Sequence, residues 1–184
     1  TVSTPIKTMA DFKGLKIRTA NPSISKALGL WGAVPVAQPI TETYQSLQLG
    51  VLDGTVLPYE GMVVFKLNEL AKYSTIGNLY TMPMMIVMNK KSWNKLPEDV
   101  KTLIDETTGL KMSMAAGKAF DDMEIPFRGI CLKKGMEENN LDPSEYQKMK
   151  ESALPLREEW VQEMEAKGLP GKAIFKTALG FVND

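Results

Sequence analysis

Residues 13–23 constrain the fold of this chain most, because they combine the patterns of a strand, a short loop and the start of a helix. Leu15 and Ile17 alternate with basic residues, which is the period of a strand with one buried face. Asn21 stands directly before Pro22, and apolar residues then follow at helical spacing. We therefore expect Asn21 to cap a helix whose first residue is Pro22, and the stretch predicts a β–α unit.

Arg18 ends the predicted strand, beside the expected N-terminus of the helix. Its guanidinium and the unpaired backbone N–H groups of the first helical turn would then lie at one edge of a sheet, where carboxylates and phosphates bind. A single arginine at a strand end is, however, most often solvated or loosely paired, and an asparagine before a helix most often only caps it. From these residues alone, an anion site and a plain surface arginine both stay open.

Strand and helix patterns alternate through the first ninety residues or so. Thr41 has the place of an N-cap, and Gly50 that of a helix end. The near-continuous apolar run at 80–88 is typical of a strand covered on both faces. The alternation predicts an α/β fold with a largely parallel sheet. Strands are expected at residues 14–18, 34–36, 55–57 and 80–88, and helices at 22–31, 42–49 and 62–72.

The second half of the chain has mostly helical patterns. Pro97 and the two acidic residues after it form a strong start signal, for a long helix that we expect to run past residue 120. One more strand is expected at 129–132. Asp142 has the position of an N-cap, and Pro155 that of a helix start, with one further helix near the C-terminus.

The composition excludes several classes of function. Twenty-two basic and twenty-two acidic residues give a formal net charge of zero, so no long-range field would attract nucleic acid. The longest apolar run is interrupted by Pro83 and is much shorter than the roughly 20 residues of a membrane span. We expect no nucleic-acid partner, and we expect the protein not to be embedded in a membrane.

Cys131 is the single cysteine, and the sequence contains no histidine. This excludes an internal disulfide, a zinc site of the usual Cys/His kind and any nucleophile paired with histidine. Adjacent acids such as Asp121 and Asp122 point in different directions on a helix and are poor candidates for a general acid and base. We therefore expect no catalytic residue, no metal site and no cofactor, so the protein is not expected to be an enzyme.

Several segments together resemble the DctP-like substrate-binding proteins of tripartite ATP-independent periplasmic (TRAP) transporters. Their order and spacing across the first hundred residues make the set specific, and the region at 158–160 resembles the family's C-terminal helices more weakly. The matching segments are DFKGLKIR at 11–18, GAVP at 32–35, ETYQSLQLGVLDG at 42–54, KLNELAKY at 66–73 and MNKKSWNKLPEDV at 88–100.

The resemblance implies a fold like that of type II periplasmic binding proteins, in which two α/β lobes are joined by strands and a long helix and the ligand binds between them. Residues 1–92 would form the second, ligand-binding α/β lobe. Residues 93–184 would form the long connecting helix and the C-terminal helices that return to the first lobe, and that N-terminal lobe would be absent from this chain. The sequence begins at Thr1 without a leader, which we interpret as a removed signal peptide or a cut from a longer chain.

The resemblance also implies the ligand contacts. In the family, the arginine of the Lys-Ile-Arg strand binds the ligand carboxylate with a two-pronged salt bridge, and that position is Arg18. Asn21 falls where the family often has a second polar contact. Leu57, Ile40 and Met84 are apolar where sugar-acid-binding relatives carry polar or aromatic side chains. The implied ligand is a monocarboxylate or keto acid with an apolar or aromatic tail, because the hydroxyls of sialic-acid-like ligands would lack partners.

Two neighbouring residues complete the expected pocket. Tyr59 would stack on the ligand or donate a hydrogen bond to it. Glu60 would pair with Arg18 or Lys16 in the open state, or remain unpaired, and the sequence leaves this open. The ligand-binding residues implied by the resemblance are Arg18, Asn21, Ile40, Leu57, Tyr59 and Met84.

The implied function is the capture of a small organic acid in the periplasm and its delivery to the membrane subunits of a TRAP transporter, without chemistry on the ligand. Two alternatives stay open. One is a TRAP receptor for C4-dicarboxylates, and the other is a ligand-sensing effector domain of a regulator. An enzyme is disfavoured by the missing histidine and the lone cysteine.

Overall fold

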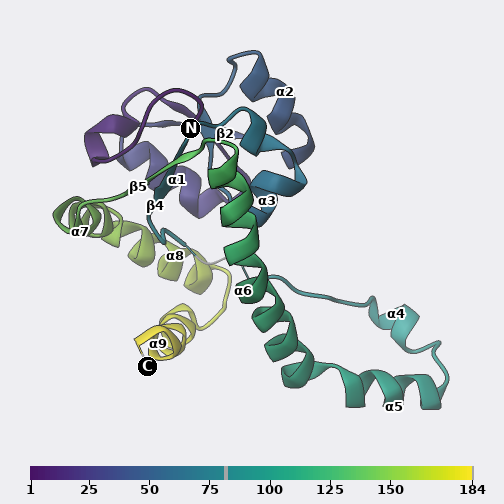
Figure 1. Ribbon diagram of the computed structural model, residues 1–184. Coiled ribbons are helices and arrows are strands. Elements are labelled where there is room, and N and C mark those ends of the chain that lie inside the picture. Colours follow the sequence, from purple (N-terminus) through teal and green to yellow (C-terminus); the bar gives the residue numbers. More distant parts are fainter. Residues whose placement is uncertain (81–82, 184) are drawn as a thin grey trace.

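The structure, a computed structural model, describes residues 1–80 and 83–183. Figure 1 shows a mixed α/β body, from which helices extend to one side. The second part of the longer helix, α6, lies against the body, where it contacts α3. The extending helices are α5 (Glu98–Thr107) and the first part of α6 (Gly109–Lys133), and we call residues 98–125 the arm.

A three-stranded parallel sheet forms the centre of the body. β1 (Lys16–Thr19) lies between β2 (Val34–Ala37) and β3 (Gly54–Thr55), and Arg18 is in register with Val36 on one side and Thr55 on the other. β2 contains Pro35 and is an edge strand, where a residue without an N–H is tolerated. The α/β fold with a parallel sheet, predicted from the sequence, is confirmed.

The helix α1 (Pro22–Leu30) follows β1 and packs against both β1 and β2. Asn21 caps it as predicted, since its side-chain oxygen accepts hydrogen bonds from the backbone N–H groups of Ser23 at 2.9 Å and Ile24 at 3.1 Å. Pro22 is the first helical residue, where its missing N–H costs nothing. The central β–α unit is therefore confirmed in detail.

A second, two-stranded parallel sheet was not predicted from the sequence. It pairs β4 (Tyr73–Ile76) with β5 (Glu137–Asn140). The sequence of β5 is entirely polar, and most residues of both strands are only half buried, so neither strand has the apolar pattern of a core strand. Pairing between segments more than sixty residues apart, rather than local composition, makes these residues strands.

The predicted strand at residues 80–88 is wrong for the part that the structure describes. Residues 83–88 form no strand, and their side chains are exposed, that of Met84 by 68%. Residues 81–82 lie outside the described part. An apolar run becomes a strand only where another strand accepts and donates its backbone hydrogen bonds, and 83–88 have no such partner among the described residues.

Two expectations for the long helical region are also wrong. The predicted helix past residue 120 is interrupted at Gly109, which has a φ of +68°, a conformation that favours glycine. The strand expected at 129–132 is instead the last turn of α6 before Lys133. Cys131 is fully buried there, whereas its apolar neighbour Ile130 is 40% exposed, as expected of adjacent residues that point to different faces of a helix.

The remaining elements follow the predicted order with shifted ends. Thr41 lies inside a 3-10 turn and does not cap a helix, and the helix expected at 62–72 begins earlier and ends at Val64. Asp142 caps its helix as predicted, accepting from the Ser144 N–H at 2.8 Å. The other elements are η1 (Met9–Phe12), η2 (Ile40–Glu42), α2 (Thr43–Gln48), α3 (Tyr59–Val64), η3 (Leu67–Glu69), α4 (Lys90–Trp93), α7 (Pro143–Ser152), α8 (Leu154–Ala166) and α9 (Gly171–Asn183).

C-terminal elements complete both hydrophobic cores of the body. Met149 of α7 belongs to the core formed by Ile17, Leu28 and Trp31, and Cys131 of α6 belongs to a second core. The body is therefore closed by residues from both halves of the sequence. The division of the chain into a ligand-binding lobe at 1–92 and a helical part at 93–184 stays a prediction.

We expect Leu28→Ala to destabilise the protein by about 2–5 kcal/mol, because Leu28 is fully buried between α1 and the sheet and its removal leaves a cavity. Leu30→Ala is the matched control on the same helix, since Leu30 is 51% exposed, and it should cost about 0.5 kcal/mol or less. Urea denaturation followed by circular dichroism measures both changes. Equal costs for the two variants would contradict this packing.

Candidate functional site

Arg18 is buried at the end of β1, with 6% of its surface exposed. Its Nε donates a hydrogen bond to the backbone carbonyl of Gln38 at 3.1 Å, which holds the guanidinium beside the loop after β2. No carboxylate of the described residues lies within ion-pair distance of Arg18. A buried cation without a counter-charge is costly, and an incoming anion would offset that cost.

Burial lowers the pKa of the Arg18 guanidinium, while the nearby phenol of Tyr80 acts in the opposite direction. Arginine nonetheless stays protonated at every physiological pH. Burial raises the pKa of Tyr80, and the charge of Arg18 opposes that shift. Tyr80 and Arg18 therefore influence each other electrostatically. In the sequence, Tyr80 is only the first residue of a predicted strand, because no local signal links it to Arg18.

The N-terminus of α1 contributes less to an anion site than expected. Pro22 has no N–H, and the N–H groups of Ser23 and Ile24 are both occupied by the side-chain oxygen of Asn21. The predicted unpaired backbone donors are therefore not available, and that part of the expectation is wrong. The described donors that remain at this edge include the Arg18 guanidinium and the side-chain NH₂ of Asn21, since only the oxygen of Asn21 is used by the cap.

The expected apolar wall residues lie in two different settings. Ile40 and Leu57 are half buried and pack against the same core, the one that contains Leu47 and Cys131. Met84 lies on the exposed segment 83–88. The structure thus brings Ile40 and Leu57 onto one core and leaves Met84 at the surface.

Tyr59 is buried, and its hydroxyl is already hydrogen-bonded. It donates to the carboxylate of Glu138 at 2.6 Å and lies 2.9 Å from the hydroxyl of Ser74. Arg128 of α6 binds the same Glu138 with two hydrogen bonds, at 2.6 and 2.7 Å. Burial, together with the Glu138 carboxylate, raises the pKa of Tyr59 to about 12. Tyr59 thus connects α3 to β5 and α6, and its contact with a ligand stays a prediction.

Glu60 forms no ion pair with Arg18 or Lys16 among the described residues. Lys16 instead donates its backbone N–H to the carboxylate of Asp53 at 2.8 Å. In the described part of the chain, no three acidic or cysteine side chains are grouped as metal ligands would be. None of the described helices is both long and apolar enough to cross a membrane.

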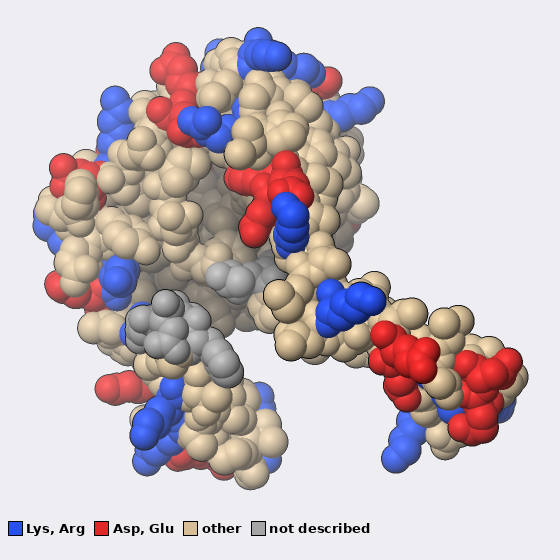
Figure 2. Space-filling view, turned by 60° about the horizontal axis from the view of Figure 1, so that its bottom comes forward, with Lys and Arg blue, Asp and Glu red and all other residues tan. Residues whose placement is uncertain are grey.

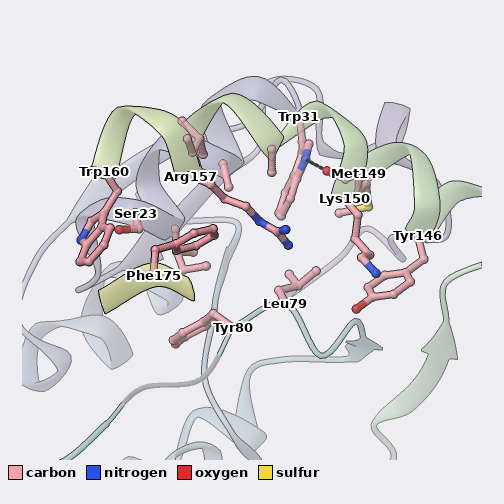
Figure 3. Close-up of a pocket in the computed structure, with 14 residues that line it drawn as sticks. Ser23, Trp31, Leu79, Tyr80, Tyr146, Met149, Lys150, Arg157, Trp160 and Phe175 are labelled. Atoms are coloured by element: carbon pink, nitrogen blue, oxygen red, sulfur yellow. Dashed lines mark hydrogen bonds between the residues drawn. The ribbon is translucent and has the colours of Figure 1, made fainter. Parts of the chain in front are cut away.

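A cavity of about 310 Å³ lies next to Tyr80, between α1, α7, α8 and α9 (Figure 3). Its walls are mostly apolar and aromatic, and they include the first turn of α1 at Ser23 and Ile24. Arg18 is not among its lining residues. The cavity and the Arg18 edge are therefore neighbouring but separate features, with Tyr80 close to both.

A parallel α/β lobe with a buried, uncompensated arginine at the rim of its sheet has the features of a binding protein for small anions. The sequence comparison agrees with this class, since residues 1–164 match DctP, the bacterial extracellular solute-binding protein family 7. The chain belongs to this family. Its members are periplasmic solute-binding proteins of transporters and are not enzymes.

Individual relatives support the same assignment. The C4-dicarboxylate-binding periplasmic protein DctP of Rhodobacter capsulatus is 30% identical over 165 residues, which cover 89% of this chain and 50% of that protein. A TRAP solute-binding protein from a marine metagenome, specific for aromatic acids and crystallised with 3-hydroxybenzoate, is 35% identical with a TM-score of 0.89. The match covers 97% of this chain and 57% of that one.

A TRAP solute-binding protein from Rhodoferax ferrireducens T118, crystallised with copurified benzoate, is 30% identical with a TM-score of 0.87. The match covers 97% of this chain and 57% of that protein. The chain thus spans about half the length of the relatives it matches.

We expect Glu138→Gln to destabilise the protein in a pH-dependent way. Hydrogen bonds from Arg128, and then from Tyr59, hold the pKa of Glu138 below its usual range. Its stabilising contribution is therefore fully present above about pH 4.3, the ordinary pKa of glutamate, and is lost as the pH falls through the lower folded-state pKa. The urea midpoint of the variant should lie below that of the wild type at pH 7, and the gap should close below about pH 4.

Glu137→Gln is the matched control for this experiment. Glu137 is the exposed neighbour of Glu138 on β5 and makes no ion pair among the described residues. Its replacement should leave the urea midpoint close to the wild-type value across the same pH range. A gap for Glu138→Gln that stays constant down to pH 3 would contradict the role of its charge.

Proposed function

We propose that this protein is the receptor of a TRAP transporter, which captures a small organic acid and delivers it to the membrane subunits. Arg18 binds the ligand carboxylate through a two-pronged salt bridge in this proposal. The observation that carries it is the burial of Arg18 without an acidic partner among the described residues, at the rim of a parallel sheet. The planar guanidinium matches a carboxylate better than a lysine would.

The proposed ligand is a monocarboxylate with an apolar or aromatic tail. The pocket has apolar walls, which suit such a tail, and Ile40 and Leu57 supply part of them. Met84, which the resemblance places in the same pocket, is a third apolar wall residue. The similar structures with benzoate and 3-hydroxybenzoate bind ligands of this kind. Asn21 serves both as helix cap and as ligand contact, because its NH₂ group is not used by the cap.

The second candidate ligand is a C4-dicarboxylate. The similar protein of Rhodobacter capsulatus is named as a C4-dicarboxylate-binding protein. Two carboxylates require two counter-charges or equivalent donors. Arg18 is the cation at the described rim of the sheet, and Glu60 adds a negative charge to the same lobe. The monocarboxylate is therefore the better match to this lobe.

The proposal includes closure of this lobe against a second one. The relatives are about twice as long as this chain. The segment 83–88 and the arm expose many apolar side chains, and Figure 2 shows the arm standing away from the body. A second lobe resting on this surface would bury it and close over Arg18. The exposed apolar side chains of the arm include Leu103, Leu110, Met114, Phe120 and Ile125.

We expect Arg18→Ala to weaken the binding of benzoate by the intact protein at least about 100-fold, because two charge-assisted hydrogen bonds are lost. Calorimetry measures the affinity. The stability of the ligand-free protein should change little, since the loss of the hydrogen bond to the Gln38 carbonyl is offset by the removal of a buried charge that has no described acidic partner. Lys16→Ala is the control, because it removes an exposed cation from the same strand and should leave the affinity unchanged. Wild-type affinity in Arg18→Ala would refute the assignment.

We expect two substitutions of Asn21 to separate its two roles. Asn21→Ala removes the cap and should cost about 1 kcal/mol of stability. Asn21→Asp keeps an oxygen that accepts from Ser23 and Ile24, so stability should be retained. The aspartate also replaces a donor by a negative charge beside the ligand carboxylate, and the affinity for benzoate should fall about tenfold or more. Unchanged affinity in Asn21→Asp would mean that Asn21 is only a cap.

A further inference from the structure

The cavity beside Tyr80 has a wall of rigid aromatic side chains. Trp31 is fixed by its indole N–H, which donates to the hydroxyl of Ser152 at 3.1 Å and lies 3.3 Å from the carbonyl of Met149. Trp160 and Phe175 contact each other across α8 and α9, with ring centroids 6.4 Å apart. Figure 3 shows these rings arranged around one space. The cavity is therefore bounded by several packed helices and does not depend on a single loop.

Two cations reach this apolar space. The guanidinium of Arg157 points from α8 into the middle of the cavity, and Lys150 of α7 lies toward the ring of Tyr146, 5.6 Å from its centroid (Figure 3). Neither cation forms an ion pair with a described carboxylate, and no acidic residue is among those that line the cavity. Both residues are exposed, so their positive charges face solvent as well as the cavity, and no described acidic side chain of the lining competes with a bound anion for them.

We propose that this cavity is a second small-molecule site, for an amphipathic monocarboxylate with an aromatic body. The aromatic body lies between Trp31, Trp160 and Phe175, where stacking and apolar burial favour it. The carboxylate binds Arg157, whose planar guanidinium fits it. Lys150 adds a second positive charge to the lining of the cavity. The volume of about 310 Å³ is at the lower end of the range for ligand pockets, which suits a molecule of one or two rings.

This site does not depend on the proposed function of Arg18. The two features use different cations, on β1 and on α8, and Arg18 does not line the cavity. Tyr80 is the residue close to both, as a lining residue of the cavity and an electrostatic neighbour of Arg18. The two sites can therefore be tested separately by removing one cation at a time.

The test uses 2-naphthoate as the probe and the intact protein carrying Arg18→Ala, so that the Arg18 edge cannot bind the probe carboxylate. Trp31 and Trp160 line the cavity and report binding through their fluorescence, and calorimetry gives the stoichiometry. We expect saturable binding of one molecule per chain. Adding Arg157→Gln should weaken this binding at least tenfold. Lys167→Gln is the matched control, because Lys167 is an exposed cation just beyond α8 that does not line the cavity, and it should change little.

A second measurement needs no substitution in the cavity. The neutral 2-naphthamide has the same rings as 2-naphthoate but no charge, and it should bind at least tenfold more weakly. The proposal is overturned if 2-naphthoate does not saturate a site in the Arg18→Ala protein. It is also overturned if Arg157→Gln leaves the affinity unchanged, or if the amide binds as well as the acid. A different result would refute the proposal for Arg18. That result is benzoate binding with wild-type affinity in the double variant Arg18→Ala, Arg157→Gln.

Discussion

The buried guanidinium of Arg18 is the feature on which the rest of the site depends. Its position comes from β1, which is the central strand of a parallel sheet, and from the carbonyl of Gln38, which accepts from its Nε. The fold places this charge out of water and provides no acidic partner among the described residues. An arrangement of this kind carries an energetic cost in the empty protein, and a bound carboxylate offsets it. In the proposed function, the ligand carboxylate supplies the missing counter-charge of the lobe.

Elements from the second half of the sequence hold this lobe together. The helix α6 runs from the exposed arm into the second core, and Arg128, Glu138 and Tyr59 connect it to β5 and α3. Farther along, α7 and α8 cover α1 through Met149 and the ion pair of Lys26 with Glu163. The arm is thus anchored firmly at one end only.

Local signals predicted the parts of the structure that local contacts stabilise. Asn21 caps α1, and Asp142 caps α7, because each cap is a contact between residues two or three positions apart. The incorrect predictions concern segments whose state depends on distant partners. The apolar run at 83–88 lacks a described strand beside it, whereas the polar segment Glu137–Asn140 is a strand because β4 lies next to it. A short apolar run does not distinguish a helix from a strand, as at 129–132.

The sequence by itself determined the order of strands and helices around Arg18, the cap at Asn21 and the resemblance to a family of acid-binding receptors. The tertiary structure decided that the cap occupies the backbone donors of α1, that Tyr59 is bound to Glu138, and that Tyr80 influences the pKa of Arg18. It also brought Trp31, Arg157 and Phe175 around one cavity. The physical reason is range: caps and amphipathic patterns act over a few residues, whereas burial and the pairing of charges depend on segments that meet only when the chain is folded.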